Sequence, residues 1–401
     1  MAKRRIETWL AVFVGLVALG LLAFGGLWVY ISATAIPIHP NPQDVTSVTQ
    51  SAPQAKWTDA IAEARQFARA HLVDHNLPGL SVAVGAAGDI VWAEGMGWTD
   101  IEKKSPVAPN TRFRIGTAST LLTSAAAGVL LEQGRLDFDE PIQKHVPEFP
   151  QKEWPVTLRQ VMGHVAGLPN DGGDEGELFG RHCDRPVDAL QYFAGRSLRF
   201  EPNTQYRYSN YGFIVVSAAI EAAADELFLT FMRKQIFDPL GMKDTEADAS
   251  NEATGDRATS YFPRFAADPR YGPDLMRPLD FSCYAGSSVF VSTPSDLVRF
   301  ALAINSGKLL KPATVQLMQT SQRLTSGAET GYGLGWDLET ATIAGTPTRL
   351  IGHDGDLLGG MASSLTTLPD QGIVVSVISN TSYADTDKLA IKIAEAFAKI
   401  R

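Results

Sequence analysis

The sequence predicts an α+β fold, because short strand pairs stand near both ends of the body and helical patterns fill the middle. Residues 80–85 and 90–95 are apolar runs joined around Gly88-Asp89, a typical hairpin signal. Residues 363–368 and 372–379 form a second pair around a Pro-Asp-Gln turn. Since strands joined by tight turns are antiparallel, we expect the two hairpins to share one antiparallel sheet.

Helical patterns flank and separate these hairpins. Apolar residues recur near the helical period in residues 58–75 and again from Leu389 to Ile400, so two helices are expected to cover one face of the sheet. The other helical patterns lie between the hairpins, at residues 117–133, 186–194, 212–224, 227–236 and 294–306. We therefore expect a helical region, about residues 117–300, inserted between the two halves of the sheet.

The composition excludes several classes of protein. The 401 residues are 45% hydrophobic and 20% charged, so the chain can bury a sizeable core. A formal net charge of −9 argues against a nucleic-acid partner, which usually requires a basic face. The cysteines, Cys183 and Cys283, are too few for a disulfide-rich scaffold or a four-cysteine zinc site. They are candidates either for one disulfide or for two buried free thiols.

The N-terminal segment predicts a membrane anchor. Basic residues at positions 3–5 precede an uncharged apolar run at residues 9–31, and about 20 such residues suffice to cross a bilayer. The next basic residue is Lys56, so the positive-inside rule places residues 1–8 in the cytoplasm and the body outside. In a bacterium this means a single-pass protein of the inner membrane with its body in the periplasm. A cleaved signal peptide is the alternative, because residues 33–35 fit a small-residue cleavage pattern.

Residues 32–56 are rich in Pro, Ser, Thr and Gln and show no apolar period, which predicts a linker. The body is then residues 57–401. It contains no nucleophile elbow, Walker loop, dinucleotide fingerprint or His-Glu-x-x-His motif. His71 and His75 stand four apart on a predicted helix and could share a metal, but no third ligand is apparent, so an exposed helix end is the simpler interpretation.

Three segments carry residues from which an active site could be built. Thr117 and Thr120 open a predicted helix, whose N-terminus offers free N–H groups and partial positive charge. A hydroxyl there lies beside a natural oxyanion site, although an N-cap threonine is the plain alternative. The segment Tyr208-Ser209-Asn210 precedes another predicted helix, and His353-Asp354-Gly355 lies on a predicted strand.

Together these segments and their flanking phrases resemble one family, which comprises serine β-lactamases of class C type, penicillin-binding DD-peptidases and related esterases. The resemblance covers nearly all of residues 57–401 and implies a β-lactamase/transpeptidase-like fold. It is carried by PGLSVAV at 78–84, FRIG at 113–116, EPNT at 201–204 and YGLGW at 332–336. The phrase VPEFP at 146–150 resembles the LACTB-type branch, whose members are membrane-associated or mitochondrial.

Members of this family act through three motifs, Ser-x-x-Lys, Tyr-x-Asn and Lys/His-x-Gly. By resemblance, the serine attacks a carbonyl and forms an acyl-enzyme while the lysine and tyrosine share the proton transfers. Tyr208 and Asn210 match the second motif, and His353 and Gly355 match the third in its His form. The resemblance implies no metal and no organic cofactor, because the acyl-enzyme route needs none.

The resemblance also implies the groups that hold the substrate. The third motif lies on a strand at the edge of the site, which makes Asp354, Gly355 and Asp356 substrate-binding positions. The backbone N–H groups of Thr117 and Asp356 would form the oxyanion hole. A backbone donor does not depend on the identity of its side chain, so this part of the site can survive substitution.

The first motif departs from the family pattern. Thr117 stands at the position of the serine, and Thr120 stands at that of the lysine. A threonine can attack a carbonyl when a base activates it, but its β-branch crowds the hydroxyl. Thr120 cannot take a proton at neutral pH, and general-base assistance contributes roughly 10²–10⁴-fold. Residues 164–169 resemble the family's His-Thr-Ser-Gly-Leu-Pro segment, with Ala166 in place of its serine.

These departures leave three functions open. The first is a membrane-anchored homologue that is impaired in acyl transfer and binds a small acyl, peptide-like or peptidoglycan-like ligand. The second is an active acyl hydrolase, such as an esterase, peptidase or β-lactamase, with Thr117 as nucleophile and Tyr208 or His353 as base. The third is a non-catalytic scaffold.

Overall fold

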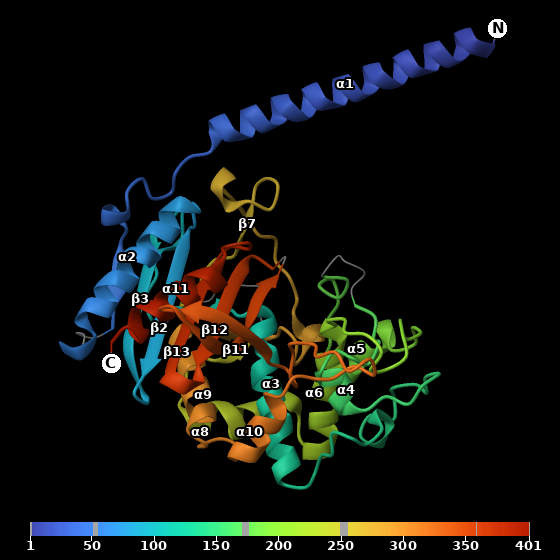
Figure 1. Ribbon diagram of the computed structural model, residues 1–401, viewed down its shortest axis with the longest axis vertical. Coiled ribbons are helices and arrows are strands. Elements are labelled where there is room, and N and C mark those ends of the chain that lie inside the picture. The colour runs from blue at the N-terminus through green and yellow to red at the C-terminus, as the bar shows by residue number, and fades with distance from the viewer. Residues whose placement is uncertain (1, 51–54, 171–175, 249–255, 358, 401) are drawn as a thin grey trace.

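The computed structural model describes residues 2–50, 55–170, 176–248, 256–357 and 359–400 of the chain. A long N-terminal helix, α1 (Ala2–Thr34), projects away from the body (Figure 1). In the body, a sheet with two covering helices lies beside a helical region that carries residues from the middle of the chain (Figure 1).

An antiparallel sheet in the order β1-β3-β2-β13-β12-β11-β10 organises the body. The two predicted hairpins lie in it side by side, because β13 pairs with β2 and places Val377 opposite Val82. The prediction of one antiparallel sheet built from both hairpins is thus confirmed. The long strands are β2 (Gly79–Ala86), β3 (Asp89–Asp100), β10 (Asp337–Ile343), β11 (Thr346–Leu357), β12 (Met361–Leu368) and β13 (Ile373–Ser379).

The two predicted covering helices, α2 (Thr58–Asp74) and α11 (Thr386–Ala398), pack together on one face of this sheet. Their apolar stripes are buried, with Leu72 and Phe397 fully removed from solvent. This burial stabilises the layer because each fully buried side chain of this size contributes about 1.5–3 kcal/mol. Trp57, at the start of α2, packs its ring 5.7 Å from that of Phe397.

The helical region lies on the opposite face, and its centre is formed by α3 and α6, which pack against each other. Nearly every residue of both helices is buried, so both are apolar all round rather than amphipathic. The helices of this region are α3 (Ser119–Glu132), α4 (Leu158–Met162), α5 (Pro186–Phe193), α6 (Asn210–Ala224), α7 (Phe228–Met232), α8 (Asp238–Leu240), α9 (Pro294–Asn305) and α10 (Pro312–Met318).

Several short strands are additions to the predicted fold. They include β4 (Ser105–Pro106), β5 (Phe113–Arg114), β6 (Glu246–Ala247), β7 (Tyr261–Pro263), β8 (Pro273–Leu275) and β9 (Phe290–Ser292). Strands of two or three residues carry no periodic pattern, so the sequence did not indicate them.

The linker prediction is wrong for residues 47–49, which form β1 (Ser47–Thr49). This strand pairs with β3, where Val48 lies opposite Gly95, because an extended segment at a sheet edge satisfies its backbone groups there. Residues 51–54 of the predicted linker lie outside the described residues.

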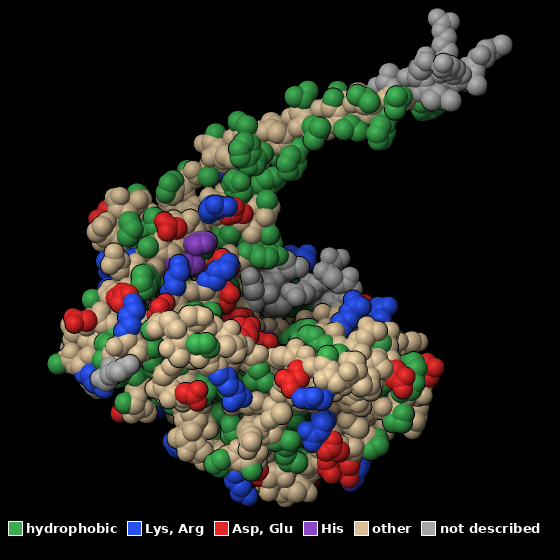
Figure 2. Space-filling model, viewed as in Figure 1, with side chains coloured by type: hydrophobic (Ala, Val, Ile, Leu, Met, Phe, Trp, Pro, Cys, Tyr) green, Lys and Arg blue, Asp and Glu red, His purple; other side chains and the backbone are tan. Residues whose placement is uncertain are grey.

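Helix α1 contains the apolar run predicted at residues 9–31. A stretch of 23 residues within it, Val12–Thr34, is long and apolar enough to cross a membrane, with a mean hydropathy of 2.4. Its large apolar side chains are exposed, as Leu22 is at 76%. Hydrophobic side chains line this helix down to the point where it meets the body (Figure 2).

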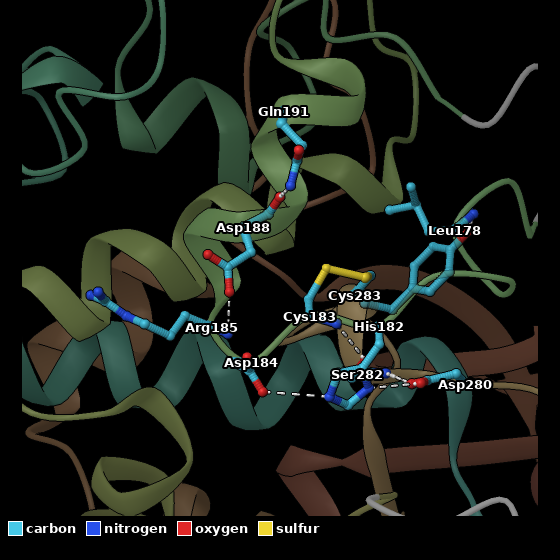
Figure 3. The surroundings of a disulfide bond; sticks show 11 residues. Leu178, His182, Cys183, Asp184, Arg185, Asp188, Gln191, Asp280, Ser282 and Cys283 are labelled. Carbon is cyan, nitrogen blue, oxygen red and sulfur yellow. Dashed lines mark hydrogen bonds and ion pairs between the residues drawn. A yellow bond between two sulfur atoms is a disulfide. The ribbon is translucent and has the colours of Figure 1, made fainter.

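Cys183 and Cys283 are joined by a disulfide, with their Cα atoms 4.9 Å apart (Figure 3). The bond ties the residues before α5 to the turn Ser282–Tyr284, and the Cys183 N–H donates a hydrogen bond of 3.0 Å to the Ser282 hydroxyl. His182 Nδ1 lies 2.9 Å from the Asp280 carboxylate beside it (Figure 3). The disulfide therefore closes a link between two segments 100 residues apart.

Removing this disulfide should destabilise the body. The double variant Cys183→Ala/Cys283→Ala should lose about 2–4 kcal/mol of unfolding free energy, because the bond restricts the unfolded chain over a long loop. Denaturant titration of the full chain in detergent measures the loss. Reducing agent should lower the wild-type midpoint and leave the variant unchanged, whereas equal midpoints for the untreated proteins would contradict the expectation.

Candidate active site

The two threonines lie where a helix N-terminus meets the sheet. Strand β5 leads into a 3₁₀ turn at Gly116–Ala118, and α3 follows directly, so Thr117 stands in the turn with only 7% of its surface exposed. Gly355 of β11 lies against this turn. A Cβ atom at Gly355 would come within 2.3 Å of the Ile115 carbonyl oxygen and 3.1 Å of the Thr117 nitrogen, so this close approach requires glycine.

The side-chain hydroxyls of both threonines donate to backbone carbonyls. Thr117 Oγ1 donates to the Asp354 oxygen at 2.9 Å, and Thr120 Oγ1 donates to the Thr117 oxygen at 2.8 Å. Thr120 is fully buried. A backbone carbonyl accepts hydrogen bonds but does not take up a proton at neutral pH. Neither of these two bonds therefore leads to a general base.

His353 shares the same carbonyl. Its Nδ1 lies 2.6 Å from the Asp354 oxygen, and its Nε2 lies 3.1 Å from the Tyr332 hydroxyl. Since the nitrogen facing a carbonyl carries the proton, Nε2 accepts from Tyr332, an assignment made from the hydrogen-bond network. Both ring nitrogens of His353 are therefore engaged.

The structure also brings the Tyr208 segment to this place. The ring of Tyr208 lies 6.0 Å from that of His353 and 4.1 Å from that of His164. Asn210 is buried at the start of α6, where its side-chain amide oxygen Oδ1 accepts from the Ser287 hydroxyl at 3.4 Å. The three segments singled out in the sequence thus meet at the junction of α3, α6 and β11.

Tyr332 was not singled out as a site residue, although it begins the family phrase YGLGW. It is 1% exposed, and burial raises the pKa of its hydroxyl well above the usual value, with neighbouring Tyr208 adding to the rise. An interaction with the Thr120 hydroxyl opposes this rise only in part. Tyr332 therefore stays a neutral donor between Thr120 and His353.

His164 is the second site residue that the sequence did not single out, although it stands in a segment similar to the family's His-Thr-Ser-Gly-Leu-Pro. It is 2% exposed, and its Nδ1 accepts the Ser209 N–H at 3.3 Å. Burial lowers the pKa of His164 well below the usual value, and His353 lowers it further, so the imidazole is neutral at physiological pH. Its ring lies 4.8 Å from that of Tyr332.

The side chain of Asp354 points away from the threonine turn, so the implied substrate-binding role of this position stays a prediction that only its backbone could fulfil. Side chains alternate along a strand, so His353 and Gly355 face the threonine turn while Asp354 points to the other face of the sheet. There its carboxyl interacts with Ser364, which is opposite it on β12, and lies near Asp387 at the start of α11. Asp354 contributes only its carbonyl to the site.

Asp356 lies in β11 opposite Ala362, and its side chain lies outside the described residues. The Thr117 N–H belongs to the first turn at the helix N-terminus, where N–H groups have no partner within the helix. An oxyanion hole made by these two backbone groups stays a prediction.

The histidine pair on α2 is separate from this site. The rings of His71 and His75 are 4.1 Å apart, and His71 Nε2 lies 2.6 Å from the Ala384 carbonyl oxygen. Burial lowers the pKa of His71 to about 4. Among the described residues, no three His, Cys, Asp or Glu side chains are placed to hold a metal ion.

Comparison with known proteins places this geometry in a family. The model of the Beta-lactamase family matches residues 61–398. The chain belongs to the beta-lactamase family. It is 26% identical to the serine beta-lactamase-like protein LACTB, mitochondrial, of Mus musculus, over 91% of this chain and 87% of the mouse protein. The expected family relationship is confirmed.

Solved structures show the same fold for this beta-lactamase family member. The D-amino acid amidase from Ochrobactrum anthropi SV3, complexed with D-phenylalanine, has a TM-score of 0.70 at 22% identity and covers 86% of this chain and 100% of the amidase. The octameric penicillin-binding protein homologue from Pyrococcus abyssi has a TM-score of 0.68 at 23% identity and covers 82% of this chain and 76% of its own. The predicted α+β architecture is confirmed.

Gly355→Ala should weaken the contact between β11 and the threonine turn of this beta-lactamase homologue. The added methyl group overlaps backbone atoms, so β11 must shift, and we expect a loss of about 1–3 kcal/mol in unfolding free energy. Denaturant titration measures the loss. Gly180→Ala is the matched control, because nothing lies within 4 Å of a Cβ atom there. Equal unfolding free energies for the two variants would show that the backbone at Gly355 has room for a methyl group.

Asp354 lines a small pocket together with Asp337, Glu339 and Asp387, and it keeps part of its surface in solvent. Its surroundings raise the pKa of its carboxyl to about 7. Desolvation is the largest cause, the Ser364 hydrogen bond opposes it, and the three neighbouring carboxylates add repulsion. Between the usual pKa of 3.8 and about 7, the folded protein holds a proton that the unfolded chain has released.

Stability should therefore fall as the pH rises through this interval, and Asp354→Asn should reduce the fall. Unfolding midpoints at about pH 5 and about pH 8 measure it in both proteins. Asp370→Asn, which removes an exposed carboxylate from the turn after β12, is the control and should behave like wild type. An identical pH dependence in the Asp354→Asn variant would overturn the assignment.

Proposed function

We propose that this beta-lactamase family member binds a small acyl or peptide-like ligand at the Thr117 site and carries out acyl transfer only feebly. The observation that carries the proposal is the hydrogen bond from Thr117 Oγ1 to the Asp354 carbonyl oxygen. A nucleophilic hydroxyl must give its proton to a base as it attacks, and this carbonyl cannot serve as one.

The position of the family's lysine gives independent support. Thr120 stands there, fully buried, with its own hydroxyl donated to the Thr117 oxygen. A lysine at this position would supply both a proton acceptor and a positive charge. Loss of general-base assistance costs roughly 10²–10⁴-fold in rate. The neighbouring His164 is neutral and so does not replace the missing charge.

Binding does not require this proton chemistry. The helix N-terminus that bears Thr117 carries partial positive charge, which attracts a carbonyl or carboxylate oxygen. Asn210 and the Tyr208 ring are retained near it. The similar D-amino acid amidase holds D-phenylalanine, which agrees with a ligand that contains an amino-acid unit. A peptide or peptidoglycan-like fragment with an acyl group meets these requirements.

An active acyl hydrolase is the second candidate, because the imidazole of His353 stands beside Thr117 and contacts the same carbonyl oxygen. Its Nδ1 is held by the Asp354 oxygen and its Nε2 by the Tyr332 hydroxyl. To act as a base, His353 would have to exchange the Tyr332 bond for one to Thr117. The first candidate is favoured because it needs no such rearrangement.

The proposal includes a single-pass anchor. Helix α1 with its basic N-terminal residues supports a topology with the N-terminus in the cytoplasm and the body outside, in the periplasm of a bacterium. The site would then bind its ligand on the outer side of the membrane.

Intact mass after incubation with a reactive β-lactam tests the catalytic part. Wild type should gain the adduct very slowly, and Thr117→Ser/Thr120→Lys should react faster by roughly 10²-fold or more, because the double change restores a primary hydroxyl and its base. Thr117→Ala/Thr120→Lys is the matched control and should gain no adduct, since it restores the amine without a nucleophile.

Rapid, stoichiometric labelling of wild type that disappears in Thr117→Ala would contradict the proposal and establish the active hydrolase. Calorimetry with an acyl-D-amino-acid peptide tests binding on the same preparations. A folded wild type that releases no heat of binding with such peptides would argue for the scaffold instead.

A further inference from the structure

The hairpin formed by β7 and β8 lies near the end of α1 nearest the body (Figure 1), and its side chains contact that helix. We propose that the tip of this hairpin, residues 264–272, enters the membrane beside α1 and gives the body a second contact with the bilayer. The inference rests on α1 being the anchor, as in the proposed function, and goes beyond it.

Three side chains of the hairpin tip contact α1 at three successive levels. The Arg264 guanidinium donates to the Ile31 carbonyl oxygen at 2.8 Å and to the Thr34 hydroxyl at 3.0 Å. The Tyr271 hydroxyl accepts from the Trp28 indole N–H at 3.0 Å. The ring of Phe265 lies 6.1 Å from that of Phe24.

These contacts place the tip alongside α1, on the N-terminal side of the last helical residue, Thr34. With a rise of 1.5 Å per residue, Trp28 lies about 9 Å and Phe24 about 15 Å from Thr34 along the axis. The 23-residue span is about 35 Å long, whereas the hydrocarbon core is about 30 Å thick. Only the last few ångströms at each end can project beyond the hydrocarbon. A group that touches Trp28 or Phe24 therefore lies within the membrane.

The side chains of the tip become less polar the deeper they lie along α1. Arg264 is shallowest, at the level of the lipid phosphates that a guanidinium binds well. Tyr271 and Trp28 lie in the zone where aromatic residues with a polar edge are enriched. Phe265, which has no polar atom in its side chain, is deepest, and the adjacent Ala266 and Ala267 are exposed. The polarity of a bilayer falls in the same way, from charged headgroups through the interface to the hydrocarbon.

The remaining charges of the tip offset each other. Asp268 and Arg270 form an ion pair at 2.6 Å. The pair therefore adds no net charge, and Arg264 is left as the positive group toward the lipid headgroups. This favours a membrane with anionic lipids.

The base of the hairpin is held firmly by the body. The Tyr261 N–H donates to the Asn380 carbonyl oxygen at 2.8 Å, and the Tyr261 hydroxyl accepts from the Ile101 N–H at 3.0 Å. Asn380 directly follows β13 of the main sheet. Two contacts with the bilayer, joined by a rigid base, would hold the body and its site in one orientation above the membrane.

Depth-sensitive labelling of the full chain in vesicles tests this inference. Single substitutions Ala18→Cys in α1, Ala267→Cys at the tip and Ala328→Cys in an exposed loop introduce one thiol each, because the native cysteines are bonded. Each thiol carries an environment-sensitive fluorophore, in vesicles of phosphatidylcholine and phosphatidylglycerol with a quencher attached to the lipid chains. The Ala18 and Ala267 labels should shift to the blue and lose fluorescence, and the Ala328 label should do neither.

Quenching at Ala18 without quenching at Ala267 would overturn the hairpin contact and leave the anchor standing. An unquenched Ala18 label would overturn the anchor and the hairpin contact with it. Adding Phe265→Glu should release the Ala267 label from the quencher while the Ala18 label stays quenched. Leu275→Glu is the matched control, because Leu275 is 72% exposed at the base of the hairpin, and it should leave both labels unchanged.

Discussion

The carbonyl oxygen of Asp354 is the acceptor on which the site depends. It receives the Thr117 hydroxyl at 2.9 Å and faces His353 Nδ1 at 2.6 Å, so one backbone atom joins the first turn before α3 to strand β11. The contact is possible because Gly355, the next residue, has no side chain to separate the two backbones. Every other feature of the site is arranged around this junction.

The chemical consequence is a site whose hydroxyl groups donate to neighbouring acceptors and do not meet a charged base. Tyr332 donates to His353, Thr120 donates to the Thr117 oxygen, and His164 is uncharged because of burial. The hydroxyls of Thr117, Thr120 and Tyr332 each donate to an acceptor within this network, and none of these acceptors carries a charge that would draw the Thr117 proton away. The two threonines thus weaken acyl transfer together. Thr117 in place of the family's serine removes the primary hydroxyl, and Thr120 in place of its lysine removes the base.

The site is assembled from distant parts of the chain, and two links hold these parts in place. The sheet sets β11 beside β12 and β13, which come from the C-terminal end, while α3 and α6 come from the helical region. The disulfide between Cys183 and Cys283 holds α5 to the turn that precedes Ser287, whose hydroxyl lies near the Asn210 side chain. The covalent link therefore stabilises the wall of the site at some distance from the threonines.

The sequence by itself determined the two hairpins, the covering helices and the three segments that meet at the site, because apolar periodicity and short motifs are local properties. It did not indicate β1, β7 or β8, whose few residues form strands only through their pairing partners. Tyr332 and His164 became site residues only on folding, since their nearness to His353 and Tyr208 arises from packing between distant segments. The tertiary structure also decided the role of Asp354, because the pairing of β11 with β12 sends its carboxyl to one face of the sheet and leaves only its carbonyl with Thr117.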